Sequence, residues 1–187
     1  MARWEPNARE RLERAALALF AENGYDATTV AQIADRAGLT KSTFFRHFAD
    51  KREVLFAGSE MLEHQMVKAL REAPPTATPM EAVVAGVLAS AEFFDDIRRE
   101  YSRRRATVIA STPELREREL IKMASLTAGL TNALLDRGVD QDVAALAAET
   151  GVAVFRVSFE RWIAASDDVP ITEVIRSTLK TLSELTA

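Results

Sequence analysis

The stretch from Thr29 to Lys51 constrains the fold most, because it contains start and stop signals for two short helices in close succession. Thr29 and Gln32 have the spacing of a capping box, in which the hydroxyl and the amide each satisfy a main-chain group at the first turn of a helix. Gly38 then acts as a helix stop, since glycine adopts the left-handed conformation cheaply, and Thr40 caps the next helix. Two helices joined by a glycine-containing turn form a helix-turn-helix, whose second helix typically enters the major groove of DNA.

The charge of the chain is unevenly distributed, although its net value of −4 is unfavourable for DNA binding. Residues 1–56 carry nine Lys and Arg side chains against eight Asp and Glu, whereas the remaining 131 residues carry 15 against 20. Between Arg36 and Arg52, five basic side chains are opposed by one acidic side chain, which gives a local charge of +4. A basic cluster of this kind is typical of nucleic-acid binding, so we expect DNA contact at the N-terminal end only.

Helical periodicity dominates the rest of the chain, and no segment combines sustained apolar alternation with hairpin turn signals. Before the motif we expect a support helix, whose apolar face is formed by Leu12, Ala16, Leu19 and Phe20. After the motif we expect six further helices, over residues 51–71, 80–94, 96–110 and 113–136, then from residue 141 and from residue 170. The sequence therefore predicts an all-α fold of nine helices.

The composition excludes several kinds of site. The chain has no cysteine, which rules out disulfides, thiolate metal sites and a cysteine nucleophile. His47 and His64 are too far apart to share a helical metal motif, and no Gly-rich phosphate loop or nucleophile elbow is present. We therefore expect no metal, no cofactor and no enzymatic activity. The charged N-terminal segment is unlike a signal peptide, and no apolar run approaches the roughly 18 residues of a membrane span, so we expect a cytoplasmic protein.

Residues 9–55 resemble the DNA-binding domain of the TetR family of bacterial transcription regulators, which are usually repressors. The matching segments are the support helix, Gly24-Tyr25, Thr29-Val30, Ile33-Ala34, Ala37-Gly38-Leu39, Thr43 to Phe48, and Lys51. The resemblance implies a homodimer, an all-helical body with a ligand pocket, and release of the DNA operator when a small-molecule effector binds. We accordingly expect residues 1–50 to bind DNA, and residues 51–187 to bind the effector and to dimerise.

The resemblance also assigns DNA contacts position by position. Thr29 corresponds to a phosphate contact at the start of the motif, and His47 and Lys51 correspond to further phosphate contacts. Phe45 stands where the family commonly has tyrosine, so a hydroxyl that could reach phosphate is missing, and a stacking or thymine-methyl contact is the alternative there. The DNA-binding residues predicted in this way are Thr29, Thr40, Lys41, Ser42, Thr43, Phe45, Arg46, His47 and Lys51, of which Lys41, Ser42 and Thr43 match base-facing positions.

The expected helix over residues 96–110 carries a cluster of arginines. Arg98, Tyr101 and Arg105 share one face, where they could hold a phosphate or carboxylate group of a ligand. The alternative is a solvated face paired with acids, because residues 92–119 contain seven basic and seven acidic side chains. The body also resembles, at scattered positions, a TetR subgroup with an acyl-CoA-type ligand domain, which implies a small apolar or acyl-CoA-like effector. The predicted ligand-binding residues are Phe93, Ile97, Tyr101, Arg105, Leu126 and Leu130, with core packing as the alternative for the apolar ones.

Apolar side chains at helical spacing near the C-terminus suit an interface between two subunits. The predicted interface residues are Phe155, Phe159, Trp162, Leu179 and Leu182. A dimer would hold two recognition helices one DNA turn of about 34 Å, or a multiple, apart, and would therefore require a near-palindromic operator.

Two other functions remain compatible with the sequence: a helical lipid carrier or scaffold protein, and a small all-helical enzyme that uses the pocket for chemistry. DNA binding separates the first from a regulator, and turnover of a captured ligand would support the second.

Overall fold

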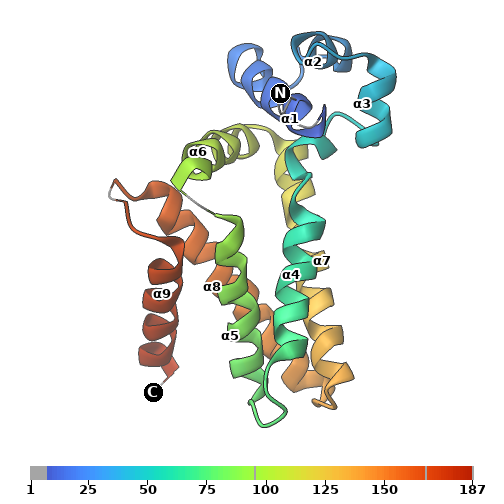
Figure 1. The fold of residues 1–187 in the computed structure, drawn as a ribbon. Helices are drawn as coiled ribbons and strands as arrows, with labels where there is room; N and C mark the ends of the chain where they lie inside the picture. The colour runs from blue at the N-terminus through green and yellow to red at the C-terminus, as the bar shows by residue number, and fades with distance from the viewer. Residues whose placement is uncertain (1–7, 95, 167, 187) are drawn as a thin grey trace, which may run out of the picture. The chain divides into compact units, whose positions relative to one another are not determined.

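The computed structural model describes residues 8–94, 96–166 and 168–186, except for the side chains of residues 96 and 97. Within these ranges the chain forms nine α-helices and two short 3-10 helices, with no strand (Figure 1). The elements are α1 Ala8–Asn23, α2 Val30–Arg36, α3 Lys41–His47, η1 Glu53–Phe56, α4 Ser59–Glu72, α5 Pro79–Ala89, η2 Ser90–Phe93, α6 Asp96–Ser111, α7 Pro113–Asp136, α8 Gln141–Ala164 and α9 Ile171–Thr186. The predicted all-α fold is therefore confirmed. None of the described helices is long and apolar enough to cross a membrane.

The chain packs into two compact units. The head unit comprises residues 8–58 and 104–119, and the body unit comprises the other described residues. The head unit thus extends to Gly58, and a segment from α6 and α7 belongs to it. The functional division into a DNA-binding and a ligand-binding domain stays a prediction.

The head unit is built on α1, which packs against α2, α3 and η1. Its core includes Phe20, Ile33 and Phe44, each at most 3% exposed. The ring of Phe48 extends this core, with its centroid 5.4 Å from that of Phe44. Burying an apolar side chain of this size contributes roughly 1.5–3 kcal/mol, so these few residues hold the short helices α2 and α3 in place.

The helix predicted over residues 51–71 is wrong in its first part. The chain forms η1, turns at residues 57–58, and begins α4 only at Ser59. Asp50 caps η1, since its Oδ1 accepts hydrogen bonds from the main-chain N–H groups of Arg52 and Glu53, at 2.8 and 3.1 Å. The consecutive apolar residues 54–56 of η1 are each at most 3% exposed, so this short element belongs to the core of the head unit.

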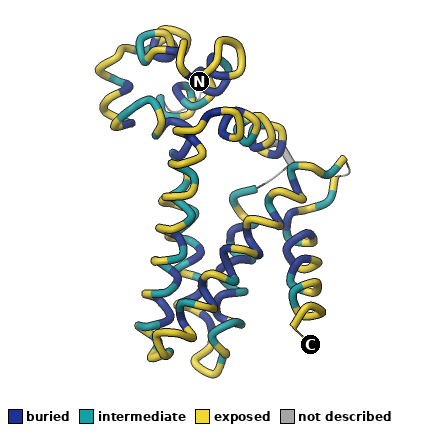
Figure 2. The backbone as a smooth tube through the Cα atoms, turned by 180° about the vertical axis from the view of Figure 1, so that it is seen from behind, coloured by how far each residue is buried: buried dark blue, intermediate teal, exposed yellow. Residues whose placement is uncertain are grey.

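The body unit is organised around α5, which packs against α4, α8 and α9. Figure 1 shows α5 running beside α4 and α8, and Figure 2 shows buried positions along these helices. Two glycines permit the close packing. A Cβ atom on Gly86 of α5 would lie 2.7 Å from the main-chain oxygen of Met66 in α4, and a Cβ atom on Gly151 of α8 would overlap with Cγ1 of Val83 in α5.

Helix ends in the body unit are satisfied partly by distant side chains. Arg137, directly after α7, donates from Nη1 to the oxygen of Ala73 at 2.9 Å and from Nη2 to the oxygen of Pro74 at 2.7 Å, just beyond the end of α4. Such donors satisfy carbonyl groups that have no partner where a helix ends.

The fifth helix ends at Ala89 rather than at the predicted residue 94, and η2 continues to Phe93.

Candidate nucleic-acid interface

The predicted helix-turn-helix is present in the head unit. α2 begins with a complete capping box, in which the N–H of Gln32 donates to Thr29 Oγ1 at 3.3 Å and the N–H of Thr29 donates to Gln32 Oε1 at 2.8 Å. Gly38 forms the turn with a φ of +64°, a left-handed conformation that favours glycine. α3 begins at a second cap, where the N–H of Thr43 donates to Thr40 Oγ1 at 3.1 Å. Local signals in the sequence therefore produce the motif.

One face of α3 is exposed and the other packs on the core of the head unit. The exposed residues are Lys41, Ser42, Phe45 and Arg46. Phe44, between them in sequence, is fully buried and anchors the helix. Among the described residues, neither Lys41 nor Arg46 has an ion-pair partner. The outward face of α3 therefore presents two available cations, one hydroxyl and one aromatic ring.

Other basic residues of the local cluster are already paired. Arg36 contacts both carboxylate oxygens of Glu22, at 3.2 and 2.9 Å. This hydrogen bonding from the guanidinium holds the pKa of the Glu22 carboxyl below its ordinary value. Arg52 Nη2 likewise lies 2.7 Å from Asp50 Oδ2. The local charge of +4 is thus partly neutralised within the head unit, and the cations of α3 are the ones left available.

Lys51 is held inside the head unit. Its Nζ donates to the main-chain oxygens of Tyr25 at 2.6 Å and Thr28 at 2.9 Å, and lies 4.0 Å from the centroid of the Tyr25 ring. Burial, together with neighbouring carboxylates, raises the pKa of the Tyr25 hydroxyl to about 12. The ammonium group thus fixes the loop that leads into α2. Contact between Lys51 and DNA phosphate stays a prediction, and the structure shows a different role for the side chain.

Two further predicted DNA contacts are only partly accessible. Thr43 is half-buried, and its Oγ1 lies 3.0 Å from Thr40 Oγ1, so its hydroxyl belongs to the cap of α3. His47 is half-buried beside Phe48, with ring centroids 6.3 Å apart. The Nε2 atom of His47 is buried and has no hydrogen-bond partner among the described residues. Thr43 therefore has a structural role in the head unit, and the DNA contacts of both side chains stay predictions.

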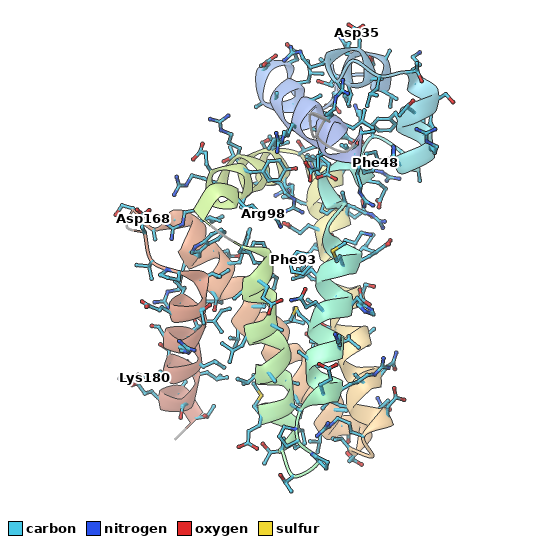
Figure 3. The ribbon with its side chains drawn as sticks, in the orientation of Figure 1. Asp35, Phe48, Phe93, Arg98, Asp168 and Lys180 are labelled. Atoms are coloured by element: carbon cyan, nitrogen blue, oxygen red, sulfur yellow. The ribbon has the colours of Figure 1, made fainter. Side chains whose placement is uncertain are left out.

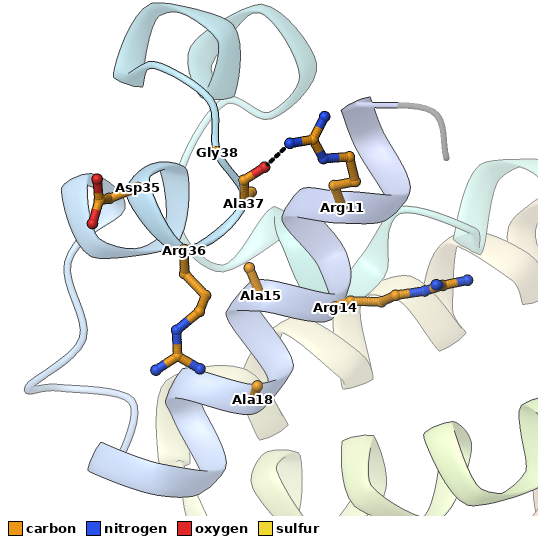
Figure 4. Close-up of a pocket in the computed structure, with 8 residues that line it drawn as sticks. All are labelled: Arg11, Arg14, Ala15, Ala18, Asp35, Arg36, Ala37 and Gly38. Atoms are coloured by element: carbon orange, nitrogen blue, oxygen red, sulfur yellow. Dashed lines mark hydrogen bonds between the residues drawn. The ribbon is translucent and has the colours of Figure 1, made fainter. Parts of the chain in front are cut away.

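A shallow groove of about 540 Å³ lies beside the turn of the motif, between α1 and the end of α2 (Figure 4). Arg11, Arg14, Asp35 and Arg36 line it together with alanines and a glycine. Arg11 points towards the turn, where its Nη2 donates to the main-chain oxygen of Ala37. This hydrogen bond satisfies a carbonyl group at the end of α2 and fixes the geometry of the turn.

In the body unit, three arginines of α6 donate hydrogen bonds to main-chain oxygens, and one of them is Arg99, whose Nη2 lies 2.6 Å from the oxygen of Val169. Arg98 lies near Phe93 and donates to its oxygen at 3.1 Å (Figure 3). Arg103 donates from Nε to the oxygen of Ile163 at 2.7 Å and from Nη2 to the oxygen of Ala165 at 3.2 Å, which caps the end of α8. The arginines of α6 therefore satisfy main-chain oxygens near helix ends. Arg103 also pairs with Glu100 at 3.2 Å, in line with the alternative of a face paired with acids.

Arg105, predicted to bind ligand, is engaged within the head unit. Its Nε donates to the main-chain oxygen of Leu55 at 2.6 Å, and its Nη1 lies 3.3 Å from Glu119 Oε1. The guanidinium carbon also lies 4.9 Å from the centroid of the Phe56 ring. These contacts hold η1, so ligand binding by Arg105 would require the side chain to leave them.

The other predicted ligand-binding residues have different surroundings. Leu126 and Leu130 belong to the core of the body unit, at 3% and 0% exposure. Phe93 and Tyr101 are half-buried, and the side chain of Ile97 lies outside the described residues. Across the described part of the chain, no group of three His, Asp or Glu residues could hold a metal ion. Ligand binding by these residues stays a prediction.

Two residues predicted for the dimer interface are buried within the protomer. Phe155 and Trp162 are 5% and 1% exposed, and their ring centroids lie 6.1 and 5.7 Å from that of Phe94. Arg99 covers this cluster, with its guanidinium carbon 5.2 Å from the centroid of the Trp162 ring. Phe155 and Trp162 therefore keep little surface for a second subunit, and their place in the interface stays a prediction. The other predicted residues are half-buried: Phe159, Leu179 and Leu182.

α8 carries an exposed apolar stripe that is not among the interface residues predicted from the sequence. Val143, Leu146 and Val157 are 46%, 70% and 40% exposed. Thr150 and Ala153 lie between them, so the five positions alternate in steps of three and four residues. This spacing is the heptad pattern of paired helices. The signal was present in the sequence as a second apolar stripe beside the core face of α8.

Known sequence families match both ends of the chain. Residues 13–57 match the family described as bacterial regulatory proteins of the tetR family, and residues 77–187, more than half of the chain, match the family described as the MftR C-terminal domain. The HTH-type transcriptional regulator TcmR from Streptomyces glaucescens is 40% identical over 75 residues, which cover 40% of this chain and 33% of TcmR. The match thus spans about a third of the length of that curated relative.

Solved structures share the fold over most of the chain. The TetR family transcriptional regulator PfmR from Thermus thermophilus is 29% identical, with 92% of this chain and 96% of PfmR covered and a TM-score of 0.52. The transcriptional regulator FadR from Bacillus subtilis, in complex with stearoyl-CoA, is 19% identical with the same coverage and a TM-score of 0.60, a likeness of fold. The helix-turn-helix, the all-helical body and these matches together show that the chain belongs to the TetR family of bacterial transcriptional regulators.

Proposed function

We propose that this protein binds a specific DNA operator, represses transcription there, and leaves the operator when a small-molecule effector binds. The outward face of α3 is the observation that supports DNA binding most directly. Lys41 and Arg46 supply cations for phosphate groups, which for Lys41 differs from the base-facing role that the resemblance implies. Ser42 and Phe45 present a hydroxyl and an apolar ring to base edges. Phosphate contacts set position and affinity, and base contacts set sequence preference. Such a regulator would act in the cytoplasm and would not be an enzyme.

The proposed regulator is a homodimer. A single α3 offers few cations, so two heads bound in register are needed for tight binding to DNA. The exposed stripe of α8, with Leu146 at 70% exposure, is the surface we assign to contact with the same stripe of a second subunit. Leu179 and Leu182 of the neighbouring helix α9 are half-buried and keep some surface for that contact. The two recognition helices would then read half-sites about 34 Å, or a multiple, apart.

The proposed effector is a small apolar or acyl-CoA-like molecule. The complex of FadR with stearoyl-CoA supports this class, because FadR shares the fold of this chain. The apolar body would receive the acyl part. A charged ligand group would have to compete with main-chain oxygens for Arg98 or Arg103, since both guanidinium groups are already engaged. To move the protein from 1:99 to 99:1 in favour of the DNA-free state, the effector must prefer that state by about 10⁴-fold.

The DNA-binding proposal is tested by a mobility shift with DNA from upstream of the protein's own gene. A scrambled duplex of the same length is the control. We expect a discrete complex with the upstream DNA that survives an excess of scrambled competitor. A complex that the scrambled duplex displaces equally well would contradict sequence-specific regulation.

The effector proposal is tested by mass spectrometry of small molecules that copurify with the protein. A true effector should weaken operator binding and also raise Tm, because it binds the folded protein only. A compound that raises Tm and leaves operator affinity unchanged would be an occupant of the body without a regulatory role.

A further inference from the structure

Phe45 is exposed on the DNA-facing side of the head unit. Its side chain is 57% exposed, and no other large apolar side chain among the described residues of the head unit is as accessible. The aromatic residues on either side of it in the core, Phe44 and Phe48, are 0% and 4% exposed. A single exposed apolar residue is common on protein surfaces, so exposure alone does not indicate a function for this ring, whereas its position does.

The ring lies among the polar groups that α3 presents to solvent. At about 100° per residue, Phe45 is about 40° from Lys41 and about 60° from Ser42 on the other side. A groove that receives the outward face of α3 must therefore also receive the ring, which lies between Lys41 and Ser42. The ring is supported from below by Phe44, with centroids 5.5 Å apart and planes at 83°. More than half of its surface stays accessible beside this support.

The chemistry of the major groove restricts what such a ring can contact. Base edges there present hydrogen-bond donors and acceptors, and the C5 methyl group of thymine is the apolar exception. A phenyl ring placed against a donor or acceptor would remove water from it without supplying a hydrogen bond. We propose that Phe45 recognises a thymine in each operator half-site through contact with its C5 methyl group. This inference rests on the proposed DNA-binding function and adds one base identity to it.

The size of the effect follows from the area of one methyl group. Burying a methyl group against an apolar surface strengthens binding roughly fourfold, so the two half-sites together gain roughly 15-fold. A ring that instead stacks on the sugar or a phosphate-flanking surface would contact DNA without sensing the methyl group. Deoxyuridine separates these two arrangements, because it pairs like thymine and lacks only that methyl group.

The experiment starts with the full-length protein and a library of random duplexes, from which the operator is selected. Each thymine of the selected half-site is then replaced by deoxyuridine, symmetrically in both half-sites, and Kd is measured by fluorescence anisotropy at fixed salt. We expect one thymine position at which the replacement raises Kd roughly 15-fold. Phe45→Ala should bind the thymine operator more weakly than wild type and should no longer distinguish thymine from deoxyuridine at that position.

Arg46→Ala is the matched control, since it removes an exposed neighbour on α3 but leaves the ring. It should bind more weakly overall and keep the full response to deoxyuridine. Wild-type affinity that is insensitive to deoxyuridine at every thymine would overturn the inference while leaving the proposed function intact. A half-site without thymine, or a Phe45→Ala variant with the full wild-type response, would also overturn it. Failure to select any sequence would overturn the proposed function, and the inference with it.

Discussion

Replacing Lys51 by methionine would remove its ammonium group and keep most of the aliphatic side chain. The lost contacts are the hydrogen bonds to the oxygens of Tyr25 and Thr28, at 2.6 and 2.9 Å, and the contact with the Tyr25 ring at 4.0 Å. Each hydrogen bond from a charged donor contributes about 1.5–3 kcal/mol, and an exposed cation–π contact about 0.5–1 kcal/mol. Because water can replace part of these contacts, we expect the free energy of unfolding to fall by about 2–4 kcal/mol, and Tm by roughly 5–15 °C.

Lys41→Met is the matched control, because it removes the same charge from an exposed position of the same unit. Its free energy of unfolding should stay within about 0.5 kcal/mol of wild type. Operator binding across salt concentrations should also distinguish the variants. Each lost phosphate contact lowers the slope of log K against log salt by about 0.9, so Lys41→Met should lower it by about 1.8 in a dimer. Lys51→Met should keep the wild-type slope and weaken binding by a similar factor at every salt concentration.

Thermal unfolding by circular dichroism and fluorescence anisotropy with labelled operator supply these measurements. A Lys51→Met variant that unfolds at the wild-type temperature and lowers the salt slope as much as Lys41→Met does would contradict the structural role of Lys51. That result would show that the ammonium group leaves the two carbonyl oxygens to contact phosphate, as the family resemblance implies.

Three other substitutions test the packing, the dimer and the buried tyrosine. Gly86→Ala should lower the free energy of unfolding by about 1–3 kcal/mol in urea denaturation, because its methyl group would lie 2.7 Å from the main-chain oxygen of Met66. Gly58→Ala is the control: its methyl group would meet open space, so the free energy of unfolding should change by less than about 1 kcal/mol. Leu146→Glu should yield monomers in analytical ultracentrifugation and weaken operator binding about 100-fold or more; an intact dimer would exclude the α8 interface. The free energy of unfolding should fall as the pH rises from about 10 to about 12, because Tyr25 loses its proton at about pH 10 in the unfolded chain and at about pH 12 in the folded protein. Urea denaturation at these pH values measures the fall, and Tyr25→Phe should lack it.

Local chemistry explains why the helix-turn-helix could be predicted from the sequence. The caps at Thr29 and Thr40 and the turn at Gly38 depend on residues at most three or four positions away, and the structure shows each of them. The same applies to Asp140, whose Oδ1 accepts hydrogen bonds at the start of α8. Such signals are complete within one turn of helix, so no distant residue is needed to read them.

The roles of the basic residues could not be predicted, because their partners are far away in sequence. Lys51 reaches Tyr25 and Thr28 across more than 20 positions, and Arg105 reaches Leu55 across 50. Spacing within one helix reveals that arginines share a face but not that carbonyl groups of other helices meet that face. Counting charge therefore overestimates the cations that the head unit can offer to DNA.

Helical periodicity also identifies apolar positions without saying what covers them. Trp162 and Leu146 both lie on apolar stripes of α8, yet Trp162 is 1% exposed and Leu146 is 70% exposed. Only the packing of α5 and α9 against α8 decides which stripe faces the core. The predicted helix is wrong over residues 51–58 for a related reason. Residues 54–56 are buried in the head unit and form η1, and the α-helix begins only at Ser59.

The affinity ratio between the selected operator and a scrambled duplex of equal length tests most directly whether this protein reads a DNA sequence. It should be measured with the wild-type protein by anisotropy titration at about 150 mM salt, where specific and non-specific binding differ clearly. We predict a ratio of about 10³ or more, with half-sites one helical turn or a multiple apart. Equal affinity for the two duplexes would contradict the claim that α3 reads a DNA sequence.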